Sequence, residues 1–154
     1  MNDFYFNKAE LRIQYANDAL EFRHDMNTWG VPDMDVALSD ACEFLIQALE
    51  LSVHGVLGYL GLAFEHPDTV DNLISELPNE QTTLPDRAVD AIRFAASRLN
   101  GMYDAEKCTV LPFVEAQHVQ EMLHQVSKVV WYTQEAVQHA ELSEPLDAPP
   151  QAMP

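Results

Sequence analysis

The stretch that decides the fold is ACEFLIQALELSVHGVL, residues 41–57. Projected at about 100° per residue, its apolar side chains cover most of the circumference of a helix, and one narrow strip stays polar. That strip contains Glu43, Gln47, Glu50 and His54. A helix with so little polar surface is typical of a central position, buried by neighbouring helices or by a second subunit.

Three glycines fall in the last turns of this helix, which we expect over residues 35–63. They are Gly55, Gly58 and Gly61, and each weakens the helix by up to about 1 kcal/mol relative to alanine. Either the close approach of a neighbouring helix or an end of the helix before Gly61 explains them.

The rest of the chain shows helical periodicity and almost no period-2 alternation, which predicts helices and no sheet. The further expected helices cover residues 3–26, 68–77, 83–100 and 112–140. We therefore expect an all-α fold, an up-and-down bundle of four to five helices, in a single domain over residues 1–140. Residues 141–154 are expected to form a disordered, Pro-rich acidic tail.

The first expected helix carries one apolar stripe that we expect to face the core. The stripe consists of Ala9, Ile13, Ala16 and Leu20. Tyr15 and Phe22 project beside it.

Charge restricts the partners that this chain can have. Eight Lys and Arg residues against 25 Asp and Glu residues give a net charge of −17, which repels phosphate backbones and anionic lipid head groups. We expect no binding to nucleic acid over a broad face and no membrane partner. The N-terminus lacks the features of a secretory signal, so a cytoplasmic location is expected. The two cysteines, Cys42 and Cys108, lack metal-type spacing and are interpreted as free thiols.

Two Glu-x-x-His runs raise the possibility of a di-metal site, which needs such runs facing inward on two helices of a bundle. Glu21 faces the polar side of its helix, and His24 lies at the border. Glu115 falls on the apolar stripe of the last helix, with His118 at its edge. A metal-dependent enzyme using Glu115 and His118 therefore stays an alternative, while the main expectation is no cofactor and no catalytic residue. No P-loop, nucleophile elbow or Gly-rich dinucleotide motif is present.

The polar strip of the central helix has two interpretations. Gln47, Glu50 and His54 form either a solvated strip, in which Glu50 and His54 are a stabilising i,i+4 pair, or a cleft for a ligand or partner. The spacing of these residues does not decide between the two.

Residues 41–57 also resemble the second helix of HEPN domains, which are named for higher eukaryotes and prokaryotes nucleotide-binding. The family pattern there is Gln-Ala-x-Glu with a Lys four residues later, and Gln47 to Glu50 followed by His54 is similar to it. HPDTVDNLI, residues 66–74, is similar to the family's His-Asp-Leu segment and short Leu-rich helix. Arg98 followed by Tyr103 lies where the family often has Arg-Tyr-Pro. The resemblance spans roughly residues 6–140.

The resemblance implies a helical bundle that is commonly a homodimer, often partnered by a minimal nucleotidyltransferase in a toxin–antitoxin context. It also implies a nucleotide or partner site formed by Gln47, Glu50, His54, His66, Arg98 and Tyr103. Ribonucleases of the family carry a His four to six residues after an Arg, whereas Arg98 has Tyr103 and Asp104 in that window. We therefore expect a non-catalytic accessory or binding subunit. A further alternative is an acidic inhibitor that mimics nucleic acid through its surface charge.

Overall fold

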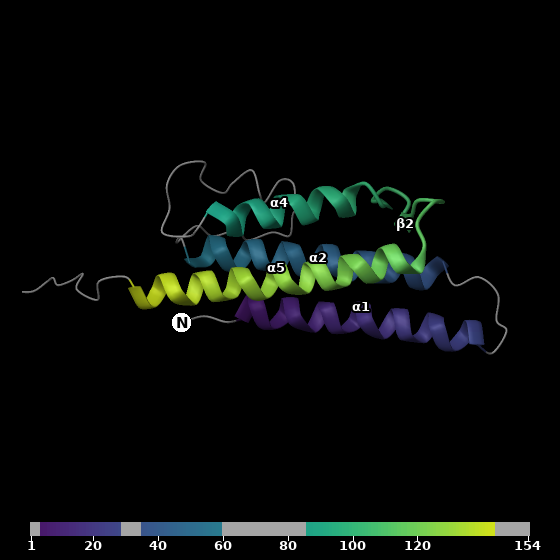
Figure 1. Ribbon diagram of the computed structural model, residues 1–154, viewed down its shortest axis with the longest axis horizontal. Helices are drawn as coiled ribbons and strands as arrows, with labels where there is room; N and C mark the ends of the chain where they lie inside the picture. Colours follow the sequence, from purple (N-terminus) through teal and green to yellow (C-terminus); the bar gives the residue numbers. More distant parts are fainter. Residues whose placement is uncertain (1–3, 29–34, 60–85, 144–154) are drawn as a thin grey trace, which may run out of the picture.

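The computed structural model describes residues 4–28, 35–59 and 86–143 of the 154-residue chain. Its elements are α1 (Phe4–Thr28), α2 (Asp35–Tyr59), α4 (Asp86–Asn100), β1 (Tyr103–Asp104), β2 (Thr109–Val110) and α5 (Ala116–Ser143). Along the sequence the four helices alternate in direction (Figure 1). The all-α bundle expected from the sequence is thereby confirmed.

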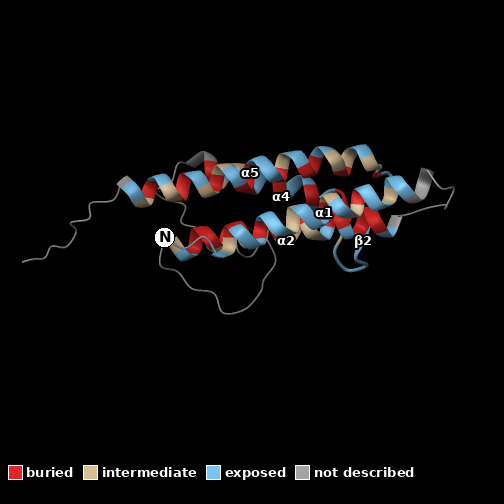
Figure 2. Ribbon diagram, turned by 90° about the horizontal axis from the view of Figure 1, so that it is seen from below, coloured by how far each residue is buried: buried red, intermediate tan, exposed pale blue. Residues whose placement is uncertain are grey.

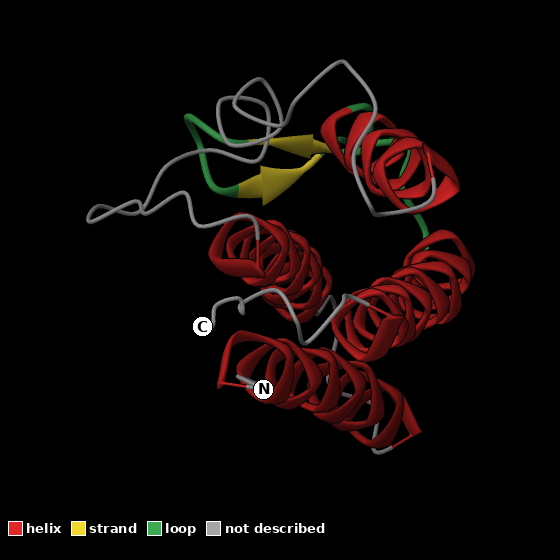
Figure 3. Ribbon diagram, turned by 90° about the vertical axis from the view of Figure 1, so that its left-hand side faces the viewer, coloured by secondary structure: helices red, strands yellow, loops and turns green. Residues whose placement is uncertain are grey.

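The second helix, α2, is the centre of the bundle. It packs against α1, α4, α5 and β2, and seen end-on it lies between the two-stranded hairpin and α1 (Figure 3). Leu45, Leu49, Val53 and Val56 have no solvent-exposed surface. Buried residues of the bundle are red in Figure 2. The apolar circumference of residues 41–57 is therefore matched by neighbours on several sides, as its composition predicts.

The first helix, α1, packs more extensively on α2 than any other pair of elements in the described structure. The two helices are in tight contact at Gly55, where a Cβ atom would lie 2.6 Å from the ring of Phe6. Phe6 is itself only 1% exposed, so its ring has no room to move away. Gly58 has nothing within 4 Å of the same position. Close helix approach therefore explains Gly55 but not Gly58, and Gly61 lies outside the described residues.

A short hairpin follows α4, so the expectation of no sheet is wrong. The helix ends at Asn100, as predicted, and the N–H of Gly101 donates to the carbonyls of Ser97 and Arg98. Tyr103 then pairs with Val110, and Asp104 with Thr109, in an antiparallel ladder. Strands of two residues are too short for alternating hydrophobicity to reveal them.

The last helix begins later and ends later than expected. It starts at Ala116 rather than Pro112, and the N–H of Glu115 donates to Nδ1 of His118, 2.9 Å away, in place of a helical partner. It runs to Ser143, so residues 141–143 are helical rather than part of a disordered tail. Its predicted inward residues, which include Val119, Val126 and Val130, are buried.

Other expectations fall outside the described residues, namely the helix over 68–77, the start of a helix at Thr83 and the tail beyond residue 143. No helix in the described ranges combines the length and apolar composition that a membrane span requires.

Replacing Gly55 by alanine is expected to destabilise the fold, whereas the same change at Gly58 is not. The new methyl group of Gly55→Ala meets the buried Phe6 ring, and such overpacking costs about 1–3 kcal/mol. Gly58→Ala removes only a helix-weakening glycine, which stabilises by up to about 1 kcal/mol. Chemical denaturation of the two variants beside the wild type measures both. Equal stability of the two variants would contradict the close approach at Gly55.

Candidate functional site

Two of the expected site residues on α2 are engaged by α1. Oε1 of Gln47 accepts a hydrogen bond of 3.0 Å from Nε of Arg12. The imidazole of His54 stacks on the ring of Tyr5, with 5.4 Å between ring centroids and an interplanar angle of 24°. These contacts hold α1 against one edge of the polar strip.

The hairpin engages the other edge of the strip through Tyr103, which was expected at the site. Its hydroxyl donates to Oε1 of Glu43 over 3.1 Å. Burial, and next the nearby Glu43 carboxylate, raise the pKa of Tyr103 above its usual value of 10, so the hydroxyl keeps the proton that it donates. The N–H of Val110 also donates to the buried Ser39 hydroxyl at 3.0 Å. Tyr103 therefore holds the hairpin on α2.

The remaining expected site residues are placed differently. Nη1 of Arg98 donates to Oε1 of Gln125 on α5 over 2.6 Å, so this guanidinium is directed to α5 rather than to the α2 strip. Glu50 is partly buried, and His66 lies outside the described residues. Among the described residues, Gln47 and His54 of α2 thus contact α1, and Tyr103 contacts Glu43 of α2. Arg98 contacts α5 instead.

The alternative metal site has no ligand cluster in the described part of the chain. Glu115 precedes α5 and is exposed, so its expected place on an apolar helical stripe is wrong. Its N–H is bound by His118, and its Oε1 accepts from Gln117 at 3.2 Å. No three His, Cys, Asp or Glu side chains gather there as a metal site would need. Glu115 and His118 act as a cap for α5.

The two thiols differ in environment. Cys42 lies in the core, and burial raises the pKa of its thiol from 9.0 to about 12. Because the thiolate is the reactive form, Cys42 is not a nucleophile near neutral pH. Cys108 is exposed in the hairpin, at a positive φ of 54°.

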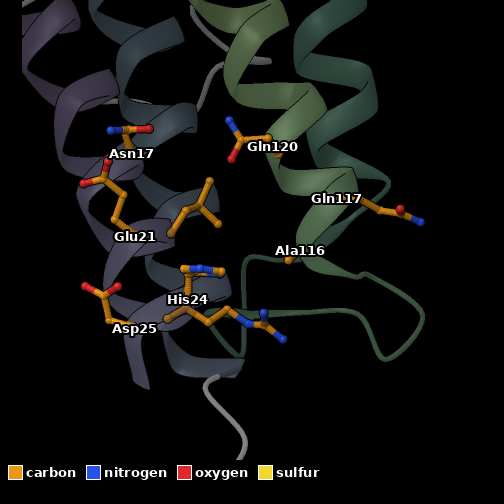
Figure 4. A pocket seen from close by; sticks show the side chains of 9 residues that line it. Asn17, Glu21, His24, Asp25, Ala116, Gln117 and Gln120 are labelled. Carbon is orange, nitrogen blue, oxygen red and sulfur yellow. The ribbon is translucent and has the colours of Figure 1, made fainter. Parts of the chain in front are cut away.

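A hollow of about 630 Å³ lies between the C-terminal half of α1 and the start of α5. Figure 4 shows Gln120 pointing from α5 toward α1. Leu20 lines it with both members of the first Glu-x-x-His run. Nε of Arg23, also in the lining, is buried and has no hydrogen-bond partner. The helical projection of the sequence placed Glu21 on the polar side of its helix and did not predict this hollow.

A second hollow of about 360 Å³ continues along the same two helices and shares Asn17 with the first. Its apolar lining includes Ile13, Leu123, Val130 and Trp131. Trp131 is 60% exposed although it adjoins the buried Val130. We call the two hollows together the α1–α5 groove. Two features of the sequence could have indicated this groove. One is an exposed Trp directly after a Val that faces inward, and the other is the presence of amide side chains between the apolar stripes.

No protein-family model, curated protein or solved structure matches this chain. The HEPN resemblance therefore rests on the motifs around residues 41–57, 66–74 and 98–103. A function for the groove has to be inferred from its own geometry.

Protonation of His54 is expected to destabilise the protein. Partial burial lowers the pKa of His54 below its usual 6.5. As pH falls through 6.5, the unfolded chain therefore takes up the proton before the folded chain does, and the free energy of unfolding decreases. In His54→Gln this contribution is absent, so the loss of stability between pH 8 and pH 5.5 should be smaller than in the wild type.

Urea unfolding at the two pH values measures the difference. Tyr5→Ala opens the stacked face of His54 to water and should reduce the pH dependence in the same direction. An unchanged pH dependence in His54→Gln would show that burial does not lower the pKa of this imidazole.

Proposed function

We propose that this protein is a non-catalytic, HEPN-like binding subunit that holds a helix of a partner protein in the α1–α5 groove. The observation that carries the proposal is Trp131, a large aromatic side chain that is 60% exposed at the edge of an apolar hollow. Exposed aromatic side chains next to pockets are typical anchors of protein interfaces. Trp131 is thus the residue on which partner binding depends most.

The dimensions and lining of the groove favour a helix as its occupant. Along α1 the lining runs from Glu10 to Asp25, which is about 22 Å at a rise of 1.5 Å per residue and accommodates about four helical turns. Ile13, Leu20 and Leu123 supply an apolar floor for the apolar face of an amphipathic helix.

Charge supports a partner helix with basic residues beside its apolar face. Glu10, Glu21 and Asp25 line the groove, against one cationic side chain, Arg23. The whole chain adds a net charge of −17, which steers basic partners toward it. A free nucleotide, being anionic, would meet these carboxylates, so the groove fits a protein better than a nucleotide.

The HEPN resemblance implies that the partner protein is a minimal nucleotidyltransferase in a toxin–antitoxin context. An acidic mimic of nucleic acid would also bind a basic partner, but through charge over a broad surface rather than through Trp131.

Truncating Trp131 is expected to abolish partner binding. The test is a native pull-down of the tagged protein from its host's lysate, with quantitative mass spectrometry of a co-purifying nucleotidyltransferase. Loss of an interface anchor costs about 2 kcal/mol or more, so Trp131→Ala should reduce recovery at least about tenfold. Phe94→Ala is the matched control, because Phe94 is also 60% exposed but lies on α4, away from the groove.

Equal recovery with Trp131→Ala and with the wild type would overturn the groove as the binding site. If recovery depended on ionic strength alone and not on Trp131, the acidic-mimic alternative would replace the proposal, since charge-driven binding weakens as salt rises.

A further inference from the structure

The outer face of α1 carries a second set of large apolar side chains that the bundle covers only in part. The Tyr15 ring contacts the Phe44 ring of α2, with 5.4 Å between ring centroids. Phe4, Leu11, Tyr15 and Phe22 are between 39% and 55% exposed. They lie within about 40° of one another around the helix and on the side opposite to Phe6, Ile13 and Leu20. We call these four residues the α1 stripe. Tyr15 and Phe22, which the helical projection set beside the apolar stripe of Ala9 and Leu20, are thus exposed.

The spacing of the α1 stripe is that of a coiled-coil seam. The intervals between its members are 7, 4 and 7 residues, which place Phe4 and Leu11 at d positions and Tyr15 and Phe22 at a positions of a heptad. The two remaining a and d positions between Phe4 and Phe22 are Lys8 and Asp18. From Phe4 to Phe22 the seam extends about 27 Å along α1.

The seam is also symmetric about its midpoint at residue 13. Reversing the direction of the helix about that point exchanges Phe4 with Phe22, Leu11 with Tyr15, and Lys8 with Asp18. A two-fold axis through the midpoint therefore places aromatic against aromatic, Leu against Tyr, and a cation against an anion. Self-complementarity of this kind is what a two-fold interface between identical chains requires.

We propose that the α1 stripe binds the α1 stripe of a second copy of this chain, with the two helices antiparallel. Each Lys8 then faces Asp18 of the other copy, and this pair occurs twice in the dimer. A parallel pair in register would instead bring Lys8 against Lys8 and Asp18 against Asp18, which is unfavourable. The charges thus select both the occupant and its direction.

Contacts within one chain already arrange the cations for this interface. Nζ of Lys8 lies 4.8 Å from the centroid of the Phe4 ring, so it is held along the stripe. Arg12 flanks the midpoint: its Cζ lies 5.8 Å from the centroid of the Tyr15 ring, while its Nε donates to Gln47 of α2. None of the stripe residues lines the α1–α5 groove, so the dimer does not depend on the proposed partner function.

Charge reversal tests the proposal on the full chain. Sedimentation equilibrium near physiological ionic strength should show a dimer for the wild type. Lys8→Asp alone and Asp18→Lys alone each replace two attractive pairs with two repulsive ones, and each should raise the dimer Kd by about tenfold or more. The double variant K8D/D18K should restore the dimer. Mixing the two single variants should likewise restore it as a heterodimer.

Lys128→Asp is the control for net charge, since Lys128 is exposed on α5 and outside the stripe; it should leave the dimer intact. Circular dichroism and thermal unfolding check that each variant is folded, which is expected because all substituted side chains are exposed. A wild type that stays monomeric at every soluble concentration, with the stripe covered by another part of the chain or by nothing, would overturn the proposal. So would a dimer that none of the charge reversals weakens.

Discussion

The close approach of α1 to α2 at Gly55 is the constraint on which the rest of the structure depends. The Phe6 ring fills the space that a side chain at position 55 would need, and small buried residues, Ala9, Ala16 and Ala48 among them, keep the two helices close along their length. α1 has less extensive packing with α5 than with α2. The groove lies on that less tightly packed side, where Asn17 and Gln120 line the space between the two helices. The tight packing of α1 on α2 thus stabilises the bundle and leaves the groove between α1 and α5.

The polar strip of α2 holds neighbouring elements of the fold against this helix. Gln47 and His54 hold α1, and Glu43 holds the hairpin through Tyr103. A net hydrogen bond of this kind contributes about 1 kcal/mol, and breaking it to bind a ligand would forfeit that contribution. Nε of Arg23 in the groove has no partner to give up. A new interaction therefore costs less in the groove than on the strip, which is why the groove is the better candidate for binding.

The sequence predicted those parts of the fold that repeat over many residues. Long periodic segments predicted the existence, order and inward faces of the described helices, down to the end of α4 at Asn100. It failed where a single local hydrogen bond decides the outcome. His118 caps the N–H of Glu115 and moves the start of α5 past Pro112, and Asp104 accepts from the N–H groups of Glu106 and Lys107 to turn the hairpin. The candidate site was harder still, because a helical projection of Arg98 does not reveal that its partner is Gln125 of another helix.

Apolar side chains on two opposite sides of α1 make sense only if that helix serves more than the core. Phe6, Ile13 and Leu20 share one side, where Phe6 is buried in the bundle and Ile13 and Leu20 line the groove, and the α1 stripe faces outward on the opposite side. In a chain with a net charge of −17, an outer helix face with no function would be expected to carry acidic residues. Instead the outward seam keeps four large apolar residues, and its two charges are of opposite sign and symmetrically placed. A two-fold dimer through this seam leaves both grooves open, one on each copy, so that the dimer has two equivalent sites for a partner helix. Two linked sites of this kind bind a partner that is itself dimeric far more tightly than either site does alone.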